Sequence, residues 1–246
     1  MSHITSAVRA DLAPTGRLRV GINYNNVILA TKDRVSGGSR GVAIDLMDEL
    51  GRRLGVEADI VAYDSVGAMV DAATAGVWDI AFLGSEPARE RSISFSPAYL
   101  EIEATYLVQG SSALEHASQV DRQGVKISAP ARANYELFLS RTLRHAQLVS
   151  ASNGGAAFDL LVAGEVQALA GLKQDLLGLA RGLPGSRVLD GRFMAVQQSI
   201  GVPKGRDAGL RYLRAVVEEA KASGLVARAI EKTGASGVFV APPAAP

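Results

Sequence analysis

The chain of 246 residues is 48% hydrophobic and 21% charged, with a formal net charge of +1 at pH 7 and no cysteine. Its apolar content suffices for a sizeable core in one or two domains, whereas its balanced, scattered charges argue against nucleic acids and anionic membranes as partners. The absence of cysteine excludes disulfides, thiolate metal sites and a cysteine nucleophile.

The first half of the chain predicts alternating strands and helices. Met1 to Asp11 is polar and expected to be loose, and apolar residues at helical or strand spacing follow. In order, we expect a strand over 17–22, a turn over 33–41, a helix over 43–54, a strand over 56–62, a helix over 66–75 and a strand over 79–83.

An extended stretch over 93–108 is long enough to lead from one lobe into another, and the alternation then resumes. The expected elements are strands over 125–129, 147–149, 166–170, 187–189 and 193–202, and helices over 134–145, 155–163 and 174–181. The strand over 193–202 is the expected return crossing. Two amphipathic helices follow, and the tail over 241–246 is expected to be disordered.

A short phrase occurs once in each half of the chain, over Ala75 to Gly84 and over Ala163 to Gly171. In each copy a helix stops at a glycine, a turn carries one polar side chain, and a short apolar strand ends at the next glycine. Such a repeat predicts two similar α/β lobes. A cleft between lobes is where small ligands most often bind.

Metal, membrane and export signals are all weak. The histidines His3, His116 and His145 are far apart and lack paired spacing, so we expect no metal and no cofactor. No apolar run has the length of a membrane span. The first residues lack the pattern of a secretory signal. Either such a signal is missing from this chain, or the protein stays in the cytoplasm.

Several motifs now resemble a known family. They are Arg17 to Gly21, the helix from Gly41 to Leu54, Gly76-x-x-Asp79, Pro87 to Arg89, and Ile93 to Tyr99. These motifs are similar, in order and from about Thr15 to Gly234, to the type II periplasmic solute-binding proteins of amino-acid ABC transporters.

The resemblance implies an α/β Venus-flytrap fold with two lobes joined by two extended crossings. Lobe 1 would comprise residues 1–103 plus 199–246, and lobe 2 residues 104–198, with the crossings acting as a hinge. It also implies a periplasmic monomer that traps a small-molecule carboxylate and delivers it to an ABC transporter permease, with no direct membrane insertion.

Arg89 precedes Phe95 by six residues, in a phrase that resembles the family's Arg-x-x-x-x-x-Phe-Ser. The resemblance implies a two-pronged contact between this arginine and the ligand's carboxylate. A guanidinium suits the role, because its paired donors match a carboxylate and stay charged. The alternative is a surface arginine paired with Glu86 or Glu90.

The resemblance also assigns other ligand-binding candidates to lobe 1. The first three lie in the loop after the first strand, the fourth starts a helix, and the last three end the repeated strand. They are Asn23, Tyr24, Asn26, Val66, Leu83, Gly84 and Ser85. The loop residues and Val66 have a plainer alternative: asparagine is a common turn residue, and Val66 is also a typical core residue. Gly84 can offer its backbone amide to an anion.

In lobe 2, the loop Arg132, Ala133 and Asn134 precedes a helix where the family has a glycine followed by serine or threonine. A helix start exposes unpaired amides and a partial positive charge, which suits a carboxylate. We expect Asn134 to cap this helix, to contact the ligand, or to do both.

Lys173 follows the second copy of the phrase, where amino-acid binders of the family usually place an aspartate for the ligand's ammonium group. Because a lysine would repel that ammonium, we expect an organic anion, such as a carboxylic or dicarboxylic acid, held by Arg89 and Lys173. The alternative is that Lys173 points to solvent and Asp175 has another role.

The expected function is therefore binding of a small anionic solute, an organic acid or an amino-acid-like carboxylate, as the substrate-binding component of an ABC transporter. A cyclohexadienyl-dehydratase-like enzyme shares the fold, but only Glu86 and Glu136 have weak claims to acid-base work, and no catalytic residue is assigned. Asp79 is interpreted as structural. The other alternative is a ligand sensor on the same fold, like the effector half of LysR-type regulators. Such a regulator needs a DNA-binding helix-turn-helix segment before the first strand, and Met1 to Leu18 is too short to form one. A freestanding cytoplasmic sensor therefore stays open.

Overall fold

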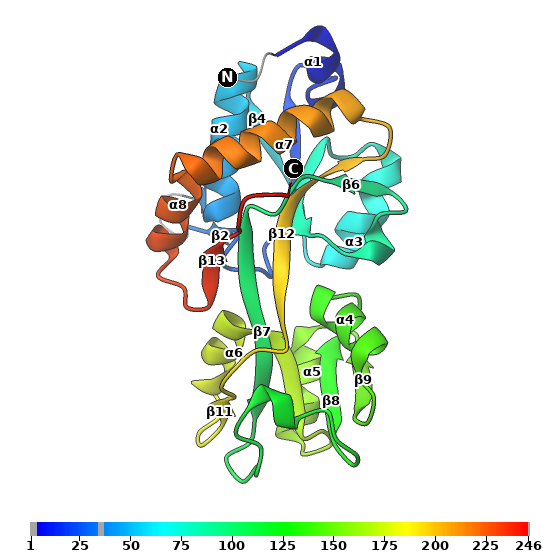
Figure 1. Cartoon of the computed structure of the whole chain (residues 1–246), viewed down its shortest axis with the longest axis vertical. Coiled ribbons are helices and arrows are strands. Elements are labelled where there is room, and N and C mark those ends of the chain that lie inside the picture. Colours follow the sequence, from blue (N-terminus) through cyan, green and yellow to red (C-terminus); the bar gives the residue numbers. More distant parts are fainter. Residues whose placement is uncertain (1–3, 34–36, 246) are drawn as a thin grey trace. The chain divides into compact units, whose positions relative to one another are not determined.

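A computed structural model describes residues 4–33 and 37–245 of the chain. The chain forms two compact units, of which unit 1 comprises Met1–Glu101 with Gln197–Pro246 and unit 2 comprises Ile102–Val196. It leaves unit 1 along β7 (Leu100–Val108) and returns along β12 (Met194–Pro203), the two long strands in Figure 1. No helix among the described residues is long and apolar enough to cross a membrane.

Unit 1 contains the strand order β4-β1-β5-β12, in which β1 runs parallel to β4 and β5, and β12 runs antiparallel to β5. The first elements are β1 (Leu18–Asn23), α2 (Val42–Leu54), β4 (Ala58–Tyr63), α3 (Val66–Asp71), the 3-10 turn η1 (Ala72–Ala75) and β5 (Ile80–Gly84). The alternation predicted for this half is confirmed. Helix α2 forms because Ala43, Leu46, Leu50 and Leu54 recur at helical spacing, and all four are buried.

Unit 1 also contains elements outside that alternation: α1 (Ser6–Leu12), β2 (Thr31–Lys32), β3 (Ser39–Arg40), η2 (Pro87–Arg89), β6 (Ile93–Phe95), α7 (Asp207–Ala222), α8 (Leu225–Thr233) and β13 (Val238–Val240). Strands β2 and β3 form a hairpin at the expected turn, of which residues 34–36 lie outside the described residues. Helices α7 and α8 confirm the two helices expected near the end of the chain.

The expectation of a loose start is wrong from Ser6 onward, and residues 1–3 lie outside the described residues. Helix α1 begins after Thr5, whose side-chain oxygen accepts a hydrogen bond from the Val8 N–H at 3.3 Å. Val8 and Leu12 are buried, and Figure 1 shows α1 beside α7. Contact with α7 thus stabilises a helix whose own sequence is too short and polar to predict it.

The expectation of a disordered tail is wrong for the residues that follow β13. Ala241 is buried, and its N–H donates to the Tyr99 carbonyl at 3.2 Å. The Pro242 carbonyl accepts a hydrogen bond from Lys221 Nζ at 2.8 Å. Pro246 lies outside the described residues.

Unit 2 has the strand order β7-β10-β8-β9, in which β10 is antiparallel to β7 but parallel to β8, and β8 is parallel to β9. Its elements after β7 are η3 (Ala117–Gln119), β8 (Lys126–Pro130), α4 (Asn134–Thr142), β9 (Gln147–Ala151), α5 (Gly154–Val162), β10 (Ala168–Leu172), α6 (Lys173–Ala180) and β11 (Arg187–Val188). The alternation predicted for the second half is confirmed.

Helix α4 ends three residues before the predicted end at His145, and Asp121 provides the reason. Its carboxylate accepts hydrogen bonds from the backbone N–H groups of Arg144, His145 and Ala146, which a continuing helix would use internally. Desolvation opposes ionisation of Asp121, but these three bonds outweigh it and hold the pKa of the carboxyl below its usual range.

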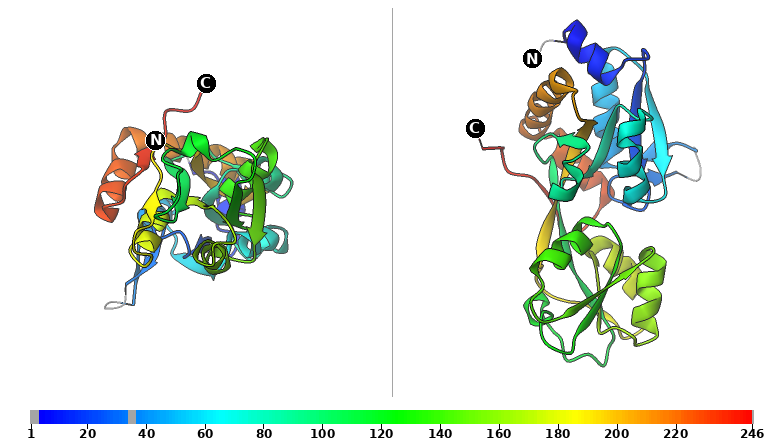
Figure 2. Two further views of the ribbon diagram at one scale, coloured as in Figure 1. Left: turned by 90° about the horizontal axis from the view of Figure 1, so that it is seen from below. Right: turned by 90° about the vertical axis from the view of Figure 1, so that its right-hand side faces the viewer.

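Both faces of the unit 2 sheet are covered by helices, as Figure 2 shows. Ala168 and Ala170 of β10 belong to the core that contains Leu139 of α4, whereas Leu169 packs with Leu161 of α5 on the other face. Because side chains alternate along a strand, β10 is buried at every residue.

Strand β5 of unit 1 is likewise buried throughout. Leu83 packs with Met69 and Trp78, and the Trp78 indole N–H donates to the Met69 carbonyl at 3.0 Å. Phe82 lies on the opposite face, where its ring meets Tyr99 edge-on at 5.8 Å between centroids.

The two copies of the repeated phrase form the same local structure. Gly76 and Gly164 adopt φ values of +65° and +74°, a region that favours glycine, at the ends of the preceding helical segments. The strands β5 and β10 then begin at equivalent positions, four residues after each glycine.

The polar residue of each copy holds the neighbouring parallel strand. The Asp79 N–H donates to the Arg19 carbonyl at 2.8 Å, and Asp79 Oδ2 accepts from the Arg19 N–H at 3.0 Å. Gln167 repeats both contacts with Lys126, each at 2.9 Å. In each unit, the repeat therefore places a residue that holds the start of the adjacent strand by two hydrogen bonds.

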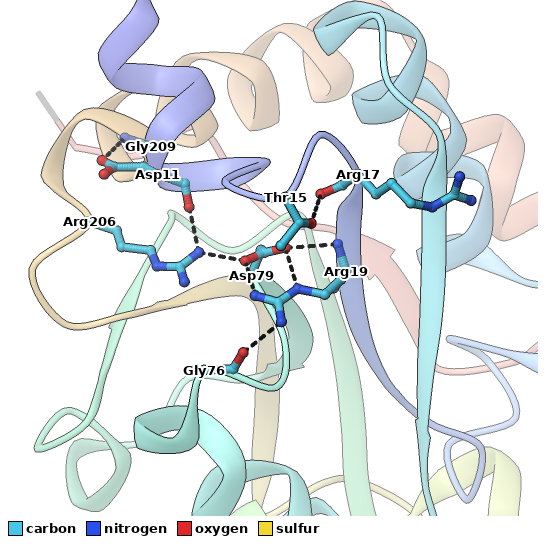
Figure 3. Close-up of polar contacts among 8 residues, drawn as sticks. All are labelled: Asp11, Thr15, Arg17, Arg19, Gly76, Asp79, Arg206 and Gly209. Atoms are coloured by element: carbon cyan, nitrogen blue, oxygen red, sulfur yellow. Dashed lines mark hydrogen bonds and ion pairs between the residues drawn. The ribbon is translucent and has the colours of Figure 1, made fainter.

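In unit 1, Asp79 is also the centre of a buried ion network, shown in Figure 3. Asp79 is fully buried and accepts hydrogen bonds from Arg19 Nη2 at 2.7 Å and Arg206 Nη1 at 2.9 Å. Arg206 also donates to the Asp11 carbonyl, and the Asp11 carboxylate accepts from the Gly209 N–H at 2.8 Å. The network joins β1, β5, α1 and α7, which confirms the structural interpretation of Asp79.

Candidate functional site

The residues predicted in unit 1 gather at one edge of its sheet. Because β1, β4 and β5 are parallel, their carboxyl ends share that edge. Asn23 ends β1, Val66 begins the helix after β4, and Gly84 ends β5. The neighbouring chain segments bring to the same edge Tyr24, Asn26, Leu83, Ser85 and Arg89. Ligands of α/β sheets usually bind outside this edge.

Arg89 ends the short turn η2 and is only 4% exposed. One of its hydrogen bonds runs from Nη1 to the Gly84 carbonyl at 2.7 Å, which ties the guanidinium to the end of β5. It is therefore not the surface side chain of the alternative interpretation. Arg91, two residues later, is exposed.

The polar side chains of the loop after β1 support the loop itself. Asn23 Oδ1 accepts from the Asn25 N–H at 3.0 Å, and Asn26 Oδ1 accepts from the Leu29 N–H at 3.4 Å. The Tyr24 hydroxyl lies 2.7 Å from Ser39 Oγ. The turn role of the asparagines is thus observed, and a contact with a ligand remains a prediction.

Val66 and Leu83 have core contacts. Val66 is partly buried against the cluster that contains Met69 and Trp78, and Leu83 belongs to that cluster. Ser85 donates from its backbone N–H to the Gln197 carbonyl at 2.8 Å, which continues the pairing of β5 with β12 by one residue.

The residues predicted in unit 2 also share one edge of their sheet. Strands β8 and β10 are parallel, and the loop Arg132 to Asn134 follows β8 while Lys173 follows β10. The antiparallel strand β7 enters at this edge, so Glu103 near its start belongs to the same region. Each unit therefore presents its candidates at the carboxyl edge of its parallel strands.

The capping role expected of Asn134 is wrong. Asn134 is the first residue of α4, and the N-cap position belongs to Ala133, whose side chain has no hydrogen-bond acceptor. Glu136 instead reaches back, and its Oε2 accepts from the Arg132 N–H at 3.1 Å. Ser150 Oγ donates to the other oxygen of Glu136 at 2.7 Å.

Arg132 has a φ of +66°, in the left-handed region that favours glycine. The Glu136 carboxylate on its N–H contributes to holding this strained loop.

Lys173 neither points freely to solvent nor stands as an isolated cation. Its Nζ lies 2.9 Å from Glu103 Oε2, and Arg192 Nη1 lies 3.7 Å from the other oxygen. Glu103 and Arg192 were missed by the sequence reasoning, because no local pattern links them to Lys173. The pairing changes the charge that a ligand would meet at this edge.

Asp175, in the first turn of α6, is a further candidate that the structure adds at this edge. Burial raises the pKa of its carboxyl to about 6. Burial also raises the pKa of Tyr135 at the start of α4, and the charge of Asp175 adds to that increase. A carboxyl with a perturbed pKa at such an edge is typical of functional sites.

The two carboxylates considered for catalysis are both buried. Glu136 accepts hydrogen bonds on both oxygens, as described above, and acts within its loop. Glu86 precedes the turn η2 and is the N-cap residue of that turn.

Comparison with known proteins adds a family and a fold. Residues 18–235 match the sequence model of the bacterial extracellular solute-binding proteins, family 3. An amino acid ABC transporter substrate-binding protein from Streptococcus pneumoniae, bound to L-arginine, is 22% identical, with a TM-score of 0.76 over 96% of this chain and 100% of that chain.

Two further solved structures are similar. The periplasmic VFT2 domain of BvgS from Bordetella pertussis is 18% identical, with a TM-score of 0.77 over 94% of this chain and 99% of that one. The ancestral amino acid-binding protein AncCDT-1, a precursor of cyclohexadienyl dehydratase, is 22% identical, with a TM-score of 0.74 over 93% and 99%. These likenesses show the type II periplasmic-binding-protein fold, as the sequence predicts.

Proposed function

Because the chain belongs to the bacterial extracellular solute-binding proteins of family 3, we propose that it binds a small anionic solute, as the substrate-binding component of an ABC transporter. The solute is an organic acid or an amino-acid-like carboxylate. Binding takes place outside the cytoplasm, in keeping with the description of the family, and the monomer passes its ligand to a permease.

The observation that carries the proposal is the position of the candidates in each unit. Sequence segments far apart, such as those of Asn23, Val66 and Arg89, reach one sheet edge in unit 1, and those of Arg132 and Lys173 reach one edge in unit 2. Ligand groups are commonly held at such edges, because strand ends and helix starts there present backbone donors.

Arg89 is the proposed partner of the ligand's carboxylate. A nearly buried guanidinium is a strong anion partner, because water competes little for its planar donors. The bond to the Gly84 carbonyl orients it. Since Glu103 compensates the charge of Lys173, Arg89 carries most of the proposed attraction for the anion.

The proposal is tested by thermal-shift screening with amino acids, monocarboxylates and dicarboxylates, followed by calorimetry with the best ligand. A binder is stabilised by whatever it closes upon. Arg89→Lys should lower the affinity at least tenfold and Arg89→Ala about a hundredfold, because a bidentate charged contact is lost. The exposed neighbour provides the control, and Arg91→Ala should stay within twofold of wild type.

Two results count against the proposal. Full affinity of Arg89→Ala for the best ligand refutes the role of this arginine. No stabilisation by any carboxylate, with stabilisation by uncharged solutes such as sugars, refutes the ligand class. The melting temperature of each variant without ligand shows whether the substitution has disturbed the end of β5.

A further inference from the structure

A carboxylate lies between two cations at the carboxyl edge of the unit 2 sheet. The antiparallel register of β7 and β10 brings Glu103 opposite Lys173, at the point where β10 passes into α6. Glu103 Oε2 lies 2.9 Å from Lys173 Nζ, and Oε1 lies 3.7 Å from Arg192 Nη1. Arg192 is brought there because the Phe193 N–H donates to the Ala104 carbonyl of β7 at 3.1 Å.

The carboxylate is the most buried member of this group. The side chain of Glu103 is 17% exposed, against 32% for Lys173 and 47% for Arg192. One oxygen faces each cation, and the shorter contact is the one to lysine. Lys173 is therefore committed to a neighbour within its own unit.

The charges at this edge balance. Three carboxyl groups, Glu103, Asp175 and Glu136, accompany three cations, Lys173, Arg192 and Arg132. A second carboxylate on a ligand needs an excess of positive charge to offset its loss of water, and the edge does not supply it.

We infer that Glu103 determines the charge of the accepted solute: by holding Lys173, it makes the unit 2 edge select ligands with a single carboxylate over dicarboxylates. The inference rests on the proposed function and narrows its ligand class. Glu103 acts through Lys173 and is a specificity-determining, positioning residue. The dicarboxylic acids expected from an uncompensated Lys173 are then the disfavoured ligands.

A purely structural ion pair would behave differently. A pair this exposed contributes little to stability, and its loss would leave the choice between ligands unchanged. The ratio of two affinities therefore separates the two roles, because a general loss of stability affects both ligands alike.

The test compares succinate with butyrate, which have the same chain length but differ by one negative charge. Calorimetry at pH 7.5 and low salt gives the preference for succinate over butyrate in wild type, Glu103→Gln, Lys173→Gln and the double variant. Glu165→Gln is the control, because it makes the same charge change at an exposed position of unit 2.

Wild type should prefer butyrate. Glu103→Gln should shift the preference toward succinate about tenfold, since one unit charge at about 6 Å in a partly hydrated site has that effect. Lys173→Gln should shift it away from succinate, and the double variant should return close to wild type. The control should stay within twofold, and 0.5 M salt should shrink the shifts.

Binding of either acid with an unchanged ratio in Glu103→Gln overturns the inference and leaves the proposed function standing. A tenfold preference of wild type for succinate does the same. If Glu103→Gln does not fold, an unchanged ratio in Lys173→Gln decides equally against the inference. If no carboxylate binds wild type at all, the proposed function fails, and this inference fails with it.

Discussion

Replacing Asp79 with asparagine removes the negative charge that Arg19 and Arg206 share inside unit 1. Asp79 is fully buried and accepts contacts of 2.7–3.0 Å from both guanidinium groups and from the Arg19 backbone N–H. Removing one partner of a buried ion pair costs about 3–5 kcal/mol. Because the two arginine side chains are 27% and 19% exposed, water recovers part of that cost, and we expect a loss of about 3 kcal/mol.

Urea unfolding followed by tryptophan fluorescence measures this loss directly. Trp78 is the single tryptophan of the chain and lies buried beside Asp79, so its emission reports on unit 1. With an m-value of about 2 kcal/mol/M, the urea midpoint should fall by about 1.5 M while m stays constant.

The repeat in unit 2 supplies the matched control. Gln167 makes the same two contacts with the neighbouring strand but is neutral and exposed, so Gln167→Ala should cost only about 1 kcal/mol by circular dichroism. The reasoning is refuted if Asp79→Asn loses less than about 1 kcal/mol, or if the two substitutions cost the same. Either result would mean that the buried charge adds nothing to the shared backbone contacts.

Three further changes have defined outcomes. Burial raises the pKa of Asp175 to about 6 from 3.8, so its folded form binds a proton more tightly, and the free energy of unfolding should fall as the pH rises from about 4 to about 6. Asp175→Asn should lack that fall, so it should be about 2 kcal/mol more stable than wild type at pH 7.5 and equally stable near pH 4. Urea midpoints at both pH values measure the difference. The prediction is contradicted if the stabilities of the two proteins change with pH in parallel. Gly41→Ala should destabilise the protein by about 3 kcal/mol or more, because φ is +138° and the new Cβ would lie 2.3 Å from the Leu29 carbonyl oxygen. The control is Gly16→Ala, at φ +82° with open space around it, which should cost only about 1 kcal/mol. Equal melting temperatures of the two variants would show that the clash with the Leu29 carbonyl is relieved. The pKa of Asp121 is lowered in the folded protein, so the stabilisation from its ionised carboxylate is present above the unfolded pKa and is lost as the pH falls through the folded pKa. Asp121→Ala should speed hydrogen exchange at the N–H groups of Arg144, His145 and Ala146, from which the carboxylate accepts hydrogen bonds. Unchanged exchange at these groups would exclude the role of Asp121 in ending α4.

The missed elements are those whose stability comes from distant contacts. Helix α1 has seven residues, too few to be stable alone, and is held by α7 through Asp11 and Gly209, 198 positions apart. The tail after β13 is similar, since Ala241 is held by the carbonyl of Tyr99. Local composition is polar or proline-rich in both segments and carries no trace of these partners.

The same distinction applies to the candidate site, because the sequence predicts where its residues lie along the chain but not which partners they meet in the fold. That Arg89, Asn134 and Lys173 follow strand ends could be read from apolar spacing and from resemblance. The partner of Lys173 could not, because Glu103 is 70 positions away and reaches it only through the register of β7 and β10.

By itself, the sequence determined the alternation of helices and strands in each half of the chain and the two-fold repetition of the phrase around Gly76 and Gly164, because periodicity and glycine conformation act between neighbouring residues. Only the tertiary structure decided which charges are compensated. Asp79 and Gln167 occupy the same place in the repeat, yet Asp79 meets two arginines and Gln167 meets a backbone amide. Electrostatic environment depends on strands and helices far apart in the chain, and packing alone brings them together.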